Sequence, residues 1–545
     1  MDSLDRLTRC DALKRLVARD ASLFSDDSVV QAEIATALGW VGLAHHEGRV
    51  SGHVRSLAAS LAADGYTDAI LCGMGGSSLA SIVLERCIGT APGWMRLHVL
   101  DTTCPETVLD VVDSVTPART VVIVSSKSGS TIEPLSLYSI LRGRFDASLG
   151  SATAGRHFVA LTDAGSQLEA LAGERGFRQV ISTPPSIGGR YSALTAFHLL
   201  PAALMGADTD ELLRRAAAME DACGGSACES PGAALAAFMI DATQSGRDKL
   251  TLLTSPGLAS FALWVEQLIA ESLGKKGRGI VPVPASGPET LRDDPADRMV
   301  ALIRFDDDDT LPALMDGVDV PAFDLVLSDA YDVGAEFVRW QYATALAGSL
   351  LDVDPFDQPN VAEAKNATAA LLDGSLPAPS PVTDFGGARV SGSGIELPAG
   401  GELADALLSA LTSVAPMDYL ALLAYVPERE ATVHLLTDAL EAAAAAVGVA
   451  GMLELGPRYL HSTGQLHKGG PDSGVFIIVI GRDGADIPVA GRPFTLRRLF
   501  EAQAEGDFVT LSKHRRRALL VELEDTEASS IEAFATALAL AASRV

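Results

Sequence analysis

Three stretches of the sequence place small, hydroxyl-bearing and basic residues directly after an apolar run. They are GMGGSS at 73–78, SSKSGST at 125–131 and PPSIGGRYS at 184–192. Backbone N–H groups in such turns, together with the positive end of a following helix, attract anions. Lys127 adds a positive charge to the second stretch, and Arg190 adds a planar guanidinium to the third. The pattern predicts a site that holds a phosphate monoester and stabilises a second, developing oxyanion.

Each stretch taken singly also has a structural explanation. A glycine-rich turn is often needed only for its backbone conformation, and hydroxyls before a helix are common caps. An arginine in a turn is often incidental. The shared phosphate site follows from placement, because loops at the carboxyl ends of parallel strands meet at one edge of a sheet. Ser78 stands where the dinucleotide fingerprint needs its last glycine, and the first loop lacks the lysine of a P-loop.

The other reactive side chains exclude several classes of enzyme. The ten histidines form no His-Glu-x-x-His or Cys/His zinc pattern, and no Gly-x-Ser-x-Gly elbow is present. The acidic run at 306–309 is typical of a solvated turn. The six cysteines form no Cys-x-x-Cys pair, which indicates reduced, packed thiols. We therefore expect no metal site and no serine-hydrolase chemistry.

Alternating apolar runs and helix-like segments must position these loops. Crossovers of about 14 to 24 residues connect the runs, which is the spacing of βαβ units with parallel strands. The predicted strands of a first unit are 67–73, 96–101, 120–126, 157–163 and 177–183. Those of a second unit are 250–255, 278–283, 298–305 and 323–329, with helices near 259–276 and 335–351. Those of a third unit are 418–426, 474–480 and 518–524, with helices at 434–450 and 530–544.

The sequence thus predicts an α/β fold with two doubly wound, flavodoxin-like parallel-sheet units and a further C-terminal α/β unit. A chain of 545 residues is long enough for three or four domains. The expected boundaries are an N-terminal helical segment at 1–65, a first unit at 66–206, a second unit at 207–373, a linker rich in Pro, Gly and Ser at 374–394, and a third unit at 395–545.

Composition narrows the range of partners. With 42 basic and 70 acidic residues the formal charge is −28, which repels nucleic acid. No apolar stretch reaches the ~20 residues that span a bilayer, and the N-terminus lacks the apolar core of a signal peptide. We therefore expect a cytoplasmic protein without a membrane partner. Because salt screens a charge within about 8–10 Å, a small anion can still bind beside isolated basic residues.

Together, the three stretches resemble the sugar-isomerase (SIS) fold of the glucose-6-phosphate isomerase family. The resemblance runs from about residue 15 to the C-terminal region. In particular, the chain is similar to the isomerase portion of bacterial transaldolase/glucose-6-phosphate isomerase fusions, with no transaldolase-sized segment before it. The resemblance implies two SIS-type units, a homodimer, no cofactor, and reversible conversion of glucose 6-phosphate to fructose 6-phosphate in glycolysis and gluconeogenesis.

The resemblance also implies the catalytic groups. Glu271, within WVEQLIAESLGK, would move the proton between C1 and C2 of the sugar, while Arg190 would stabilise the enediolate. Glu266 precedes Glu271 by five residues, about 140° around a helix, so the two carboxyls would not easily share this role. His461, within LHSTGQLHK, would open the sugar ring, and His467 is the weaker candidate for that step.

The segment PFDQPNVAEAK at 355–365 resembles a further family motif. Gln358 and Lys365 lie seven residues apart, which is two helical turns, so both side chains can face one cleft. Lys365 would share proton transfer at the ring oxygen and O1 with His461. The positions that the resemblance implies for substrate binding are Gly76, Ser77, Ser126, Lys127, Ser128, Thr131, Glu133 and Gln358.

One departure from the family leaves a question open. In ordinary members the histidine motif precedes the Gln/Lys motif, whereas here His461 follows Lys365 by almost a hundred residues and lies in the third unit. The sequence does not decide whether His461 acts in its own chain or across a dimer. It also leaves two functional alternatives, an isomerase that accepts mannose 6-phosphate as well, and a sugar-phosphate sensor without turnover.

Overall fold

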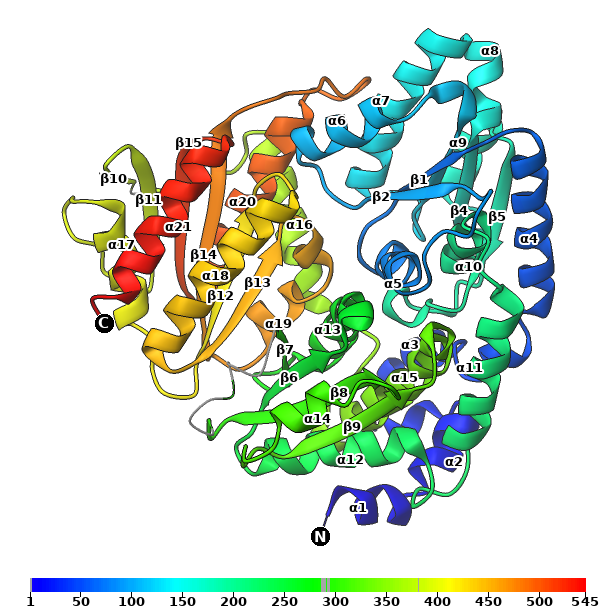
Figure 1. The fold of residues 1–545 in the computed structure, drawn as a ribbon, viewed down its shortest axis with the longest axis horizontal. Helices are drawn as coiled ribbons and strands as arrows, with labels where there is room; N and C mark the ends of the chain where they lie inside the picture. The colour runs from blue at the N-terminus through cyan, green and yellow to red at the C-terminus, as the bar shows by residue number, and fades with distance from the viewer. Residues whose placement is uncertain (1, 286–290, 292–294, 381) are drawn as a thin grey trace.

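The first sheet forms from runs rich in Val, Ile and Leu, whose shape suits extended backbone. Its strand order is β2-β1-β3-β4-β5 with every neighbouring pair parallel, which is the flavodoxin-like order. The computed structural model describes residues 2–285, 291, 295–380 and 382–545 (Figure 1). Each strand lies inside the run predicted for it. The strands are β1 (Asp68–Cys72), β2 (Arg96–Leu100), β3 (Thr120–Ser125), β4 (Phe158–Asp163) and β5 (Gln179–Thr183).

Both faces of this sheet are covered, as the doubly wound prediction requires. Alternate residues of β1 and β3, such as Leu71 and Ile123, belong to one buried cluster, while their neighbours Ile70 and Val122 belong to another. Side-chain alternation along a strand therefore feeds two separate layers. The helices of the first unit are α5 (Leu79–Ile88), α6 (Pro105–Ser114), α7 (Ile132–Leu149), α8 (Ser151–Ala154), α9 (Gln167–Glu174) and α10 (Ala196–Leu204).

Among the described residues, the second sheet has four strands that repeat the order of the first four of the first sheet. Its order is β7-β6-β8-β9, again with all pairs parallel, so the predicted fold class is confirmed. Its strands are β6 (Lys249–Thr254), β7 (Val281–Ala285), β8 (Arg298–Phe305) and β9 (Ala322–Leu327). Its helices are α11 (Thr209–Cys223), α12 (Pro231–Gln244), α13 (Ala259–Leu273), α14 (Thr310–Leu314) and α15 (Val333–Leu351).

The N-terminal helices join the first two units into one core. One cluster of buried apolar side chains is continuous from Leu7 to Val353. Within it α1 packs against α12, and α4 packs against α10. The N-terminal helices are α1 (Ser3–Arg9), α2 (Ala12–Val17), α3 (Ser28–Ala35) and α4 (Gly48–Ala63).

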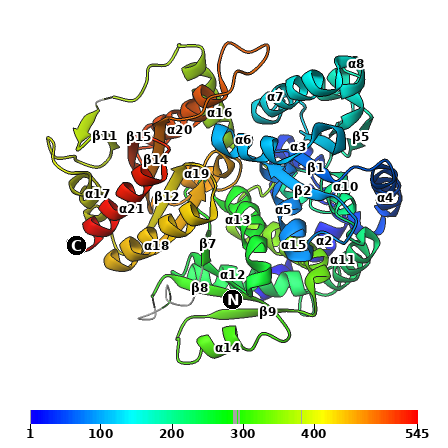
Figure 2. The ribbon, with the colours of Figure 1, turned by 45° about the horizontal axis from the view of Figure 1, so that its top comes forward.

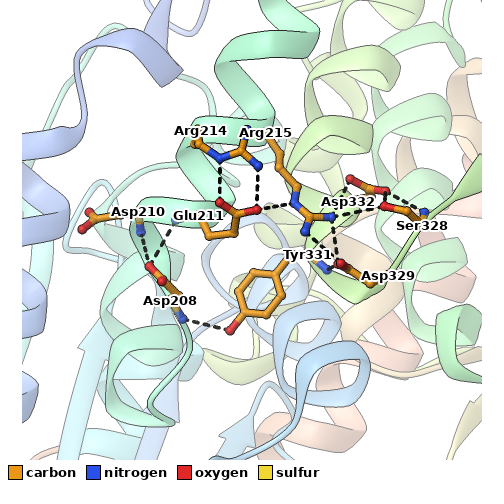
Figure 3. Close-up of polar contacts among 9 residues, drawn as sticks. All are labelled: Asp208, Asp210, Glu211, Arg214, Arg215, Ser328, Asp329, Tyr331 and Asp332. Atoms are coloured by element: carbon orange, nitrogen blue, oxygen red, sulfur yellow. Dashed lines mark hydrogen bonds and ion pairs between the residues drawn. The ribbon is translucent and has the colours of Figure 1, made fainter.

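A network of ion pairs fixes α11 to the turn after β9 on the surface of this core (Figure 3). Arg215 donates hydrogen bonds to Glu211 at 2.7 Å and to Asp329 and Asp332 at 2.8 Å. The hydroxyl of Tyr331 accepts a hydrogen bond of 3.0 Å from the backbone N–H of Asp208. One arginine shared by three carboxylates holds a helix more firmly than an isolated exposed pair would.

The third unit contains the same strand order once more. Its parallel strands run β13-β12-β14-β15, and an antiparallel hairpin, β10 and β11, extends the sheet beside β15. The sequence predicted an α/β unit here but not that its plan repeats that of the other two. The strands are β10 (Thr383–Phe385), β11 (Ala388–Ser393), β12 (Tyr419–Tyr425), β13 (Ala450–Leu455), β14 (Gly474–Asp483) and β15 (Arg517–Asp525).

Two parts of the third unit differ from the predicted elements. The segment 374–394 was expected to be a linker or long loop, and its residue 381 lies outside the described residues. The rest of the segment contains the hairpin of β10 and β11, at the outer edge of the sheet (Figure 2). Gly386 and Gly387, both with positive φ, make the reversal, and Val390 is fully buried. Strand β13 was not predicted. Only Gly448 and Val449 separate it from the Ala-rich helix, so its start was included in that helix.

Helices cover both faces of the third sheet. Val475, Ile477 and Val479 of β14 pack in one cluster, and Phe476 and Ile478 pack in the other. The first face is covered by α17 (Leu403–Thr412), α18 (Glu430–Val447) and α21 (Ala528–Ala542), and the second by α16 (Pro359–Leu372), α19 (Gly464–Gly469) and α20 (Leu496–Lys513). Among the described residues no helix is both long and apolar enough to cross a membrane.

A buried ion pair ties the third unit to the first. Arg458 donates to both oxygens of Asp101, at 2.8 and 2.9 Å, and to Glu428 at 2.6 Å. The side chain of Asp101 is only 2% exposed. A buried carboxylate that loses its partner keeps the full cost of its desolvation.

We expect Arg458→Ala to lower the free energy of unfolding by about 3–5 kcal/mol, because it leaves the buried charge of Asp101 without its partner. Arg429→Ala is the matched control, since Arg429 and Asp110 form an exposed pair between the same two units. That change should cost less than about 1 kcal/mol. Thermal unfolding of both variants measures the difference, and equal losses would refute the assignment.

Candidate active site

The loops after β1 and β3 lie together at the carboxyl edge of the first sheet, where the strand order changes direction. The hydroxyl of Ser125 donates a 3.1 Å hydrogen bond to the backbone oxygen of Ser77. The hydroxyl of Ser126 donates to that of Thr131 at 3.0 Å, and the exposed Ser128 hydroxyl follows in the same loop. The structure therefore brings the predicted hydroxyls to one edge, in the place where such sheets bind ligands.

Lys127 has a different surrounding from the one expected. Its ammonium forms an ion pair with Asp163 and donates a 2.9 Å hydrogen bond to the backbone oxygen of Pro185. Asp163 ends β4, which neighbours β3, so the carboxylate reaches the same edge of the sheet. Lys127 thus links the second and third predicted loops, and its charge is already balanced before any anion arrives.

Glycines permit two very close backbone contacts around the first loop. A Cβ atom on Gly76 would lie 2.1 Å from the carbonyl carbon of Gly189. A Cβ on Gly75, which has φ +52°, would lie 2.7 Å from the backbone oxygen of His461. The first loop therefore touches both the arginine loop of its own unit and the histidine motif of the third unit.

Arg190 is buried, with 3% of its surface exposed, and all its N–H groups face acceptors. Its Nε donates to the Ser272 hydroxyl at 2.7 Å, and one terminal nitrogen donates to the backbone oxygens of Pro355 and Asp357 at 2.7 and 2.9 Å. The other terminal nitrogen donates to Gln358 Oε1 at 2.6 Å and lies 3.3 Å from Glu271 Oε1. Three predicted site residues, Arg190, Glu271 and Gln358, thus meet at one guanidinium.

Helix α16 positions both Gln358 and Lys365. It begins at Pro359, so Gln358 stands at its N-cap and Lys365 two turns later, both exposed. The positive charge of Lys365 is close enough to Glu133 to favour the ionised form of that carboxyl. Gln358 at Arg190 and Lys365 near Glu133 therefore face the same region from one helix.

His461 and Glu133 form a pair between the third and first units. The distance from His461 Nε2 to Glu133 Oε1 is 2.9 Å, and Gln503 donates a 2.8 Å hydrogen bond to the same oxygen. Burial alone would raise the pKa of Glu133, but the charges of His461 and Lys365 and hydrogen bonds to the carboxylate hold it below its ordinary value. The histidine is therefore oriented by a carboxylate of the same chain.

Two residues of this region, Gln503 and Lys275, had no signal in the sequence. Gln503 on α20 receives a 2.6 Å hydrogen bond from the hydroxyl of Thr103, so its amide nitrogen is turned toward Glu133. Lys275 is buried under the 354–358 segment and donates to Asp357 Oδ1 at 2.6 Å. Burial and the charge of Arg190 lower the pKa of Lys275 to about 8. These contacts join residues distant in sequence, and no spacing rule reveals them.

Two weaker candidates lie elsewhere. His467 is buried inside the third unit, where its Nε2 lies 3.3 Å from Glu454 Oε1. Glu266 lines a separate cavity between the units. An open groove of about 500 Å³ beside Arg214 and Arg215 contains none of the predicted site residues. In the described part of the chain, no group of three or more His, Cys, Asp or Glu residues is arranged to hold a metal ion.

We expect Gly76→Ala to destabilise the protein by about 1–3 kcal/mol, because the new methyl group would overlap the backbone of residue 189. Gly189→Ala tests the same contact from the other side, where the nearest atom to the new Cβ would be Gly76 Cα at an ordinary 3.5 Å. Its thermal unfolding should match that of the unchanged protein. Similar melting temperatures for the two variants would contradict this close approach of the two loops.

Comparison with known proteins gives consistent matches. The profile of the phosphoglucose isomerase family matches residues 49–279, which include Arg190 and Glu271 but not Gln358, Lys365 or His461. A glucose-6-phosphate isomerase of Rubrobacter xylanophilus is 29% identical over 360 residues, covering 57% of this chain and 83% of that protein. One from Thermus thermophilus is 30% identical over 353 residues, covering 56% of this chain and 84% of the relative.

Solved structures agree in fold. A hypothetical protein from Thermus thermophilus superposes with a TM-score of 0.59 at 27% identity, covering 67% of this chain and 95% of that one. A glucose-6-phosphate isomerase from Chlamydia trachomatis gives a TM-score of 0.53 at 19% identity, covering 67% of this chain and 78% of that one. The second likeness concerns the fold alone.

Proposed function

The chain belongs to the phosphoglucose isomerase family, and from this premise we propose that it interconverts glucose 6-phosphate and fructose 6-phosphate. The proposal is supported by two pairs in one chain, Arg190 with Glu271 and His461 with Glu133, and by the loop at 75–76, which closely approaches both Gly189 and His461. An aldose–ketose conversion needs a base that moves a proton between C1 and C2, and a group that transfers protons at the sugar oxygens. It also needs a group that stabilises an oxyanion. These side chains supply all three.

In the proposed reaction the phosphate binds at Ser77, Ser126, Ser128 and Thr131, which supplies orientation far from the reacting carbons. His461 gives a proton to the ring oxygen as the bond from C1 to that oxygen breaks and O1 becomes a carbonyl. Glu133 fixes the orientation of the imidazole. Lys365, exposed on the same side, shares the proton transfer at O1.

Glu271 then removes the proton from C2 and returns it to C1, through a cis-enediolate. Because Arg190 already uses its N–H groups within the protein, we propose that an enediolate oxygen replaces the amide oxygen of Gln358 at that guanidinium. Gln358 is exposed, so its side chain can move at little cost. Electrons and protons balance within the sugar, so the conversion uses no external oxidant or reductant.

We expect Glu271→Gln to lower kcat for fructose 6-phosphate by about 10²–10⁴ with little change in KM, because it removes the base but not the phosphate contacts. Glu266→Gln, on the same helix but facing another cavity, should keep kcat near its original value. Coupling glucose 6-phosphate formation to a dehydrogenase measures both. Turnover that survives in Glu271→Gln would place the base elsewhere, and tight binding without any turnover would favour a sensor.

We further propose that His461 acts within its own chain, even if the homodimer implied by the family forms. Its partner Glu133 and the loop at Gly75 belong to the same chain. Specific activity should therefore stay constant over about a thousandfold range of protein concentration that spans the change in oligomeric state. Sedimentation of the same samples identifies the oligomer. Activity that falls in parallel with dissociation would show that the partner subunit contributes to the site.

A further inference from the structure

A cavity of about 870 Å³ lies where the three units meet, apart from the residues proposed for catalysis. The first unit contributes α5 and β2, the second contributes β6 and α13, and the third contributes α18 and β13. A cavity of this volume is in the range that holds a small organic ligand. None of the predicted catalytic or substrate-binding residues lines it.

Two carboxyl groups share one corner of the cavity. Glu266 on α13 is 6% exposed, and among the described residues no hydrogen bond or ion pair reaches its carboxyl group. Glu454 on β13 accepts a hydrogen bond from Thr463 at one oxygen, while its other oxygen, Oε1, is buried 3.3 Å from His467 Nε2 and accepts no hydrogen bond from the described residues. Burial and the neighbouring Glu454 raise the pKa of Glu266 well above its ordinary value, and Arg458 opposes this only in part.

The corner is short of hydrogen-bond donors, because among the described residues neither the carboxyl group of Glu266 nor Glu454 Oε1 accepts a hydrogen bond. Arg458, whose charge acts on Glu266, is held by Asp101 and Glu428 and forms no ion pair with Glu266. An ammonium group carries three N–H donors and one positive charge, which fits two adjacent carboxyls. The strongly acidic chain also attracts cations in general.

The walls of the cavity are apolar. Ile82 comes from the first unit, Leu263 from the second and Leu453 from the third. We propose that the cavity binds a small organic amine, with its ammonium group between Glu266 and Glu454 and its hydrocarbon part along Ile82, Leu263 and Leu453. Helix α13 also carries Glu271, and Ser462 on the wall follows His461, so the ligand touches two elements of the proposed active site.

Isothermal calorimetry of the full chain with hexylamine, 1-hexanol and hexanoate tests this proposal. The three probes share one hydrocarbon length and differ in the charge of the head group. We expect one hexylammonium ion to bind per chain, at least about tenfold more tightly than the neutral alcohol or the anion. Equal binding of hexanol, or no binding of the amine, would overturn the proposal, and this comparison requires no variant.

Variants identify the corner. Glu266→Gln should weaken hexylamine binding at least about tenfold, whereas Glu430→Gln, at the exposed mouth of the same cavity, should leave it unchanged. Unaltered affinity in a folded Glu266→Gln variant would overturn the assignment. Saturating fructose 6-phosphate should not displace the amine, and displacement would mean that it binds at the substrate site instead. The calorimetric signal is independent of turnover, so the result stands whether or not the isomerase proposal holds.

Discussion

The burial of one charged side chain, Arg190, constrains much of the arrangement around it. A guanidinium taken out of water must find an acceptor for each N–H group, or the desolvation cost remains. Here the acceptors come from two separate segments, Ser272 and Glu271 on α13 and the chain at 355–358. Moving either segment would leave part of a buried charge unsatisfied. The position of Gln358, and with it the start of α16, therefore depends on an arginine far earlier in the sequence.

The second constraint is steric, and it brings the third unit to the first. Only a residue without a Cβ atom permits the backbone of His461 to approach residue 75 so closely. With the Arg458–Asp101 ion pair nearby, this contact holds His461 against Glu133. A sheet with the same strand order as the other two thus delivers His461 to a site whose Glu133 and Arg190 come from the first unit and whose Glu271 comes from the second. The rearranged order of motifs along the chain is compatible with one site because the units meet in space.

Strand identity in the first sheet was predictable because its apolar runs are long, β-branched and separated by helical crossovers, as 120–126 illustrates. The hairpin at 383–393 was not, because edge strands need little apolar sequence and the glycines and prolines in and around it suggest a loop. For the site, the loops and Arg190 followed from local pattern, while Glu271, Gln358 and His461 came from family resemblance. Neither local pattern nor family resemblance identified Gln503 and Lys275, because their roles arise from contacts between distant segments.

The electrostatics of the site follow from how its cations are already occupied. In a chain of charge −28, Lys127 is neutralised by Asp163, and Arg190 is enclosed by protein acceptors. Neither offers a bare charge to an anion. What remains for a phosphate is the set of hydroxyls and backbone N–H groups at the helix ends. Hydrogen bonds to fixed groups select a ligand by its geometry, whereas a screened charge attracts any anion. Such a site would therefore recognise a sugar phosphate more by hydrogen-bond geometry than by electrostatic attraction.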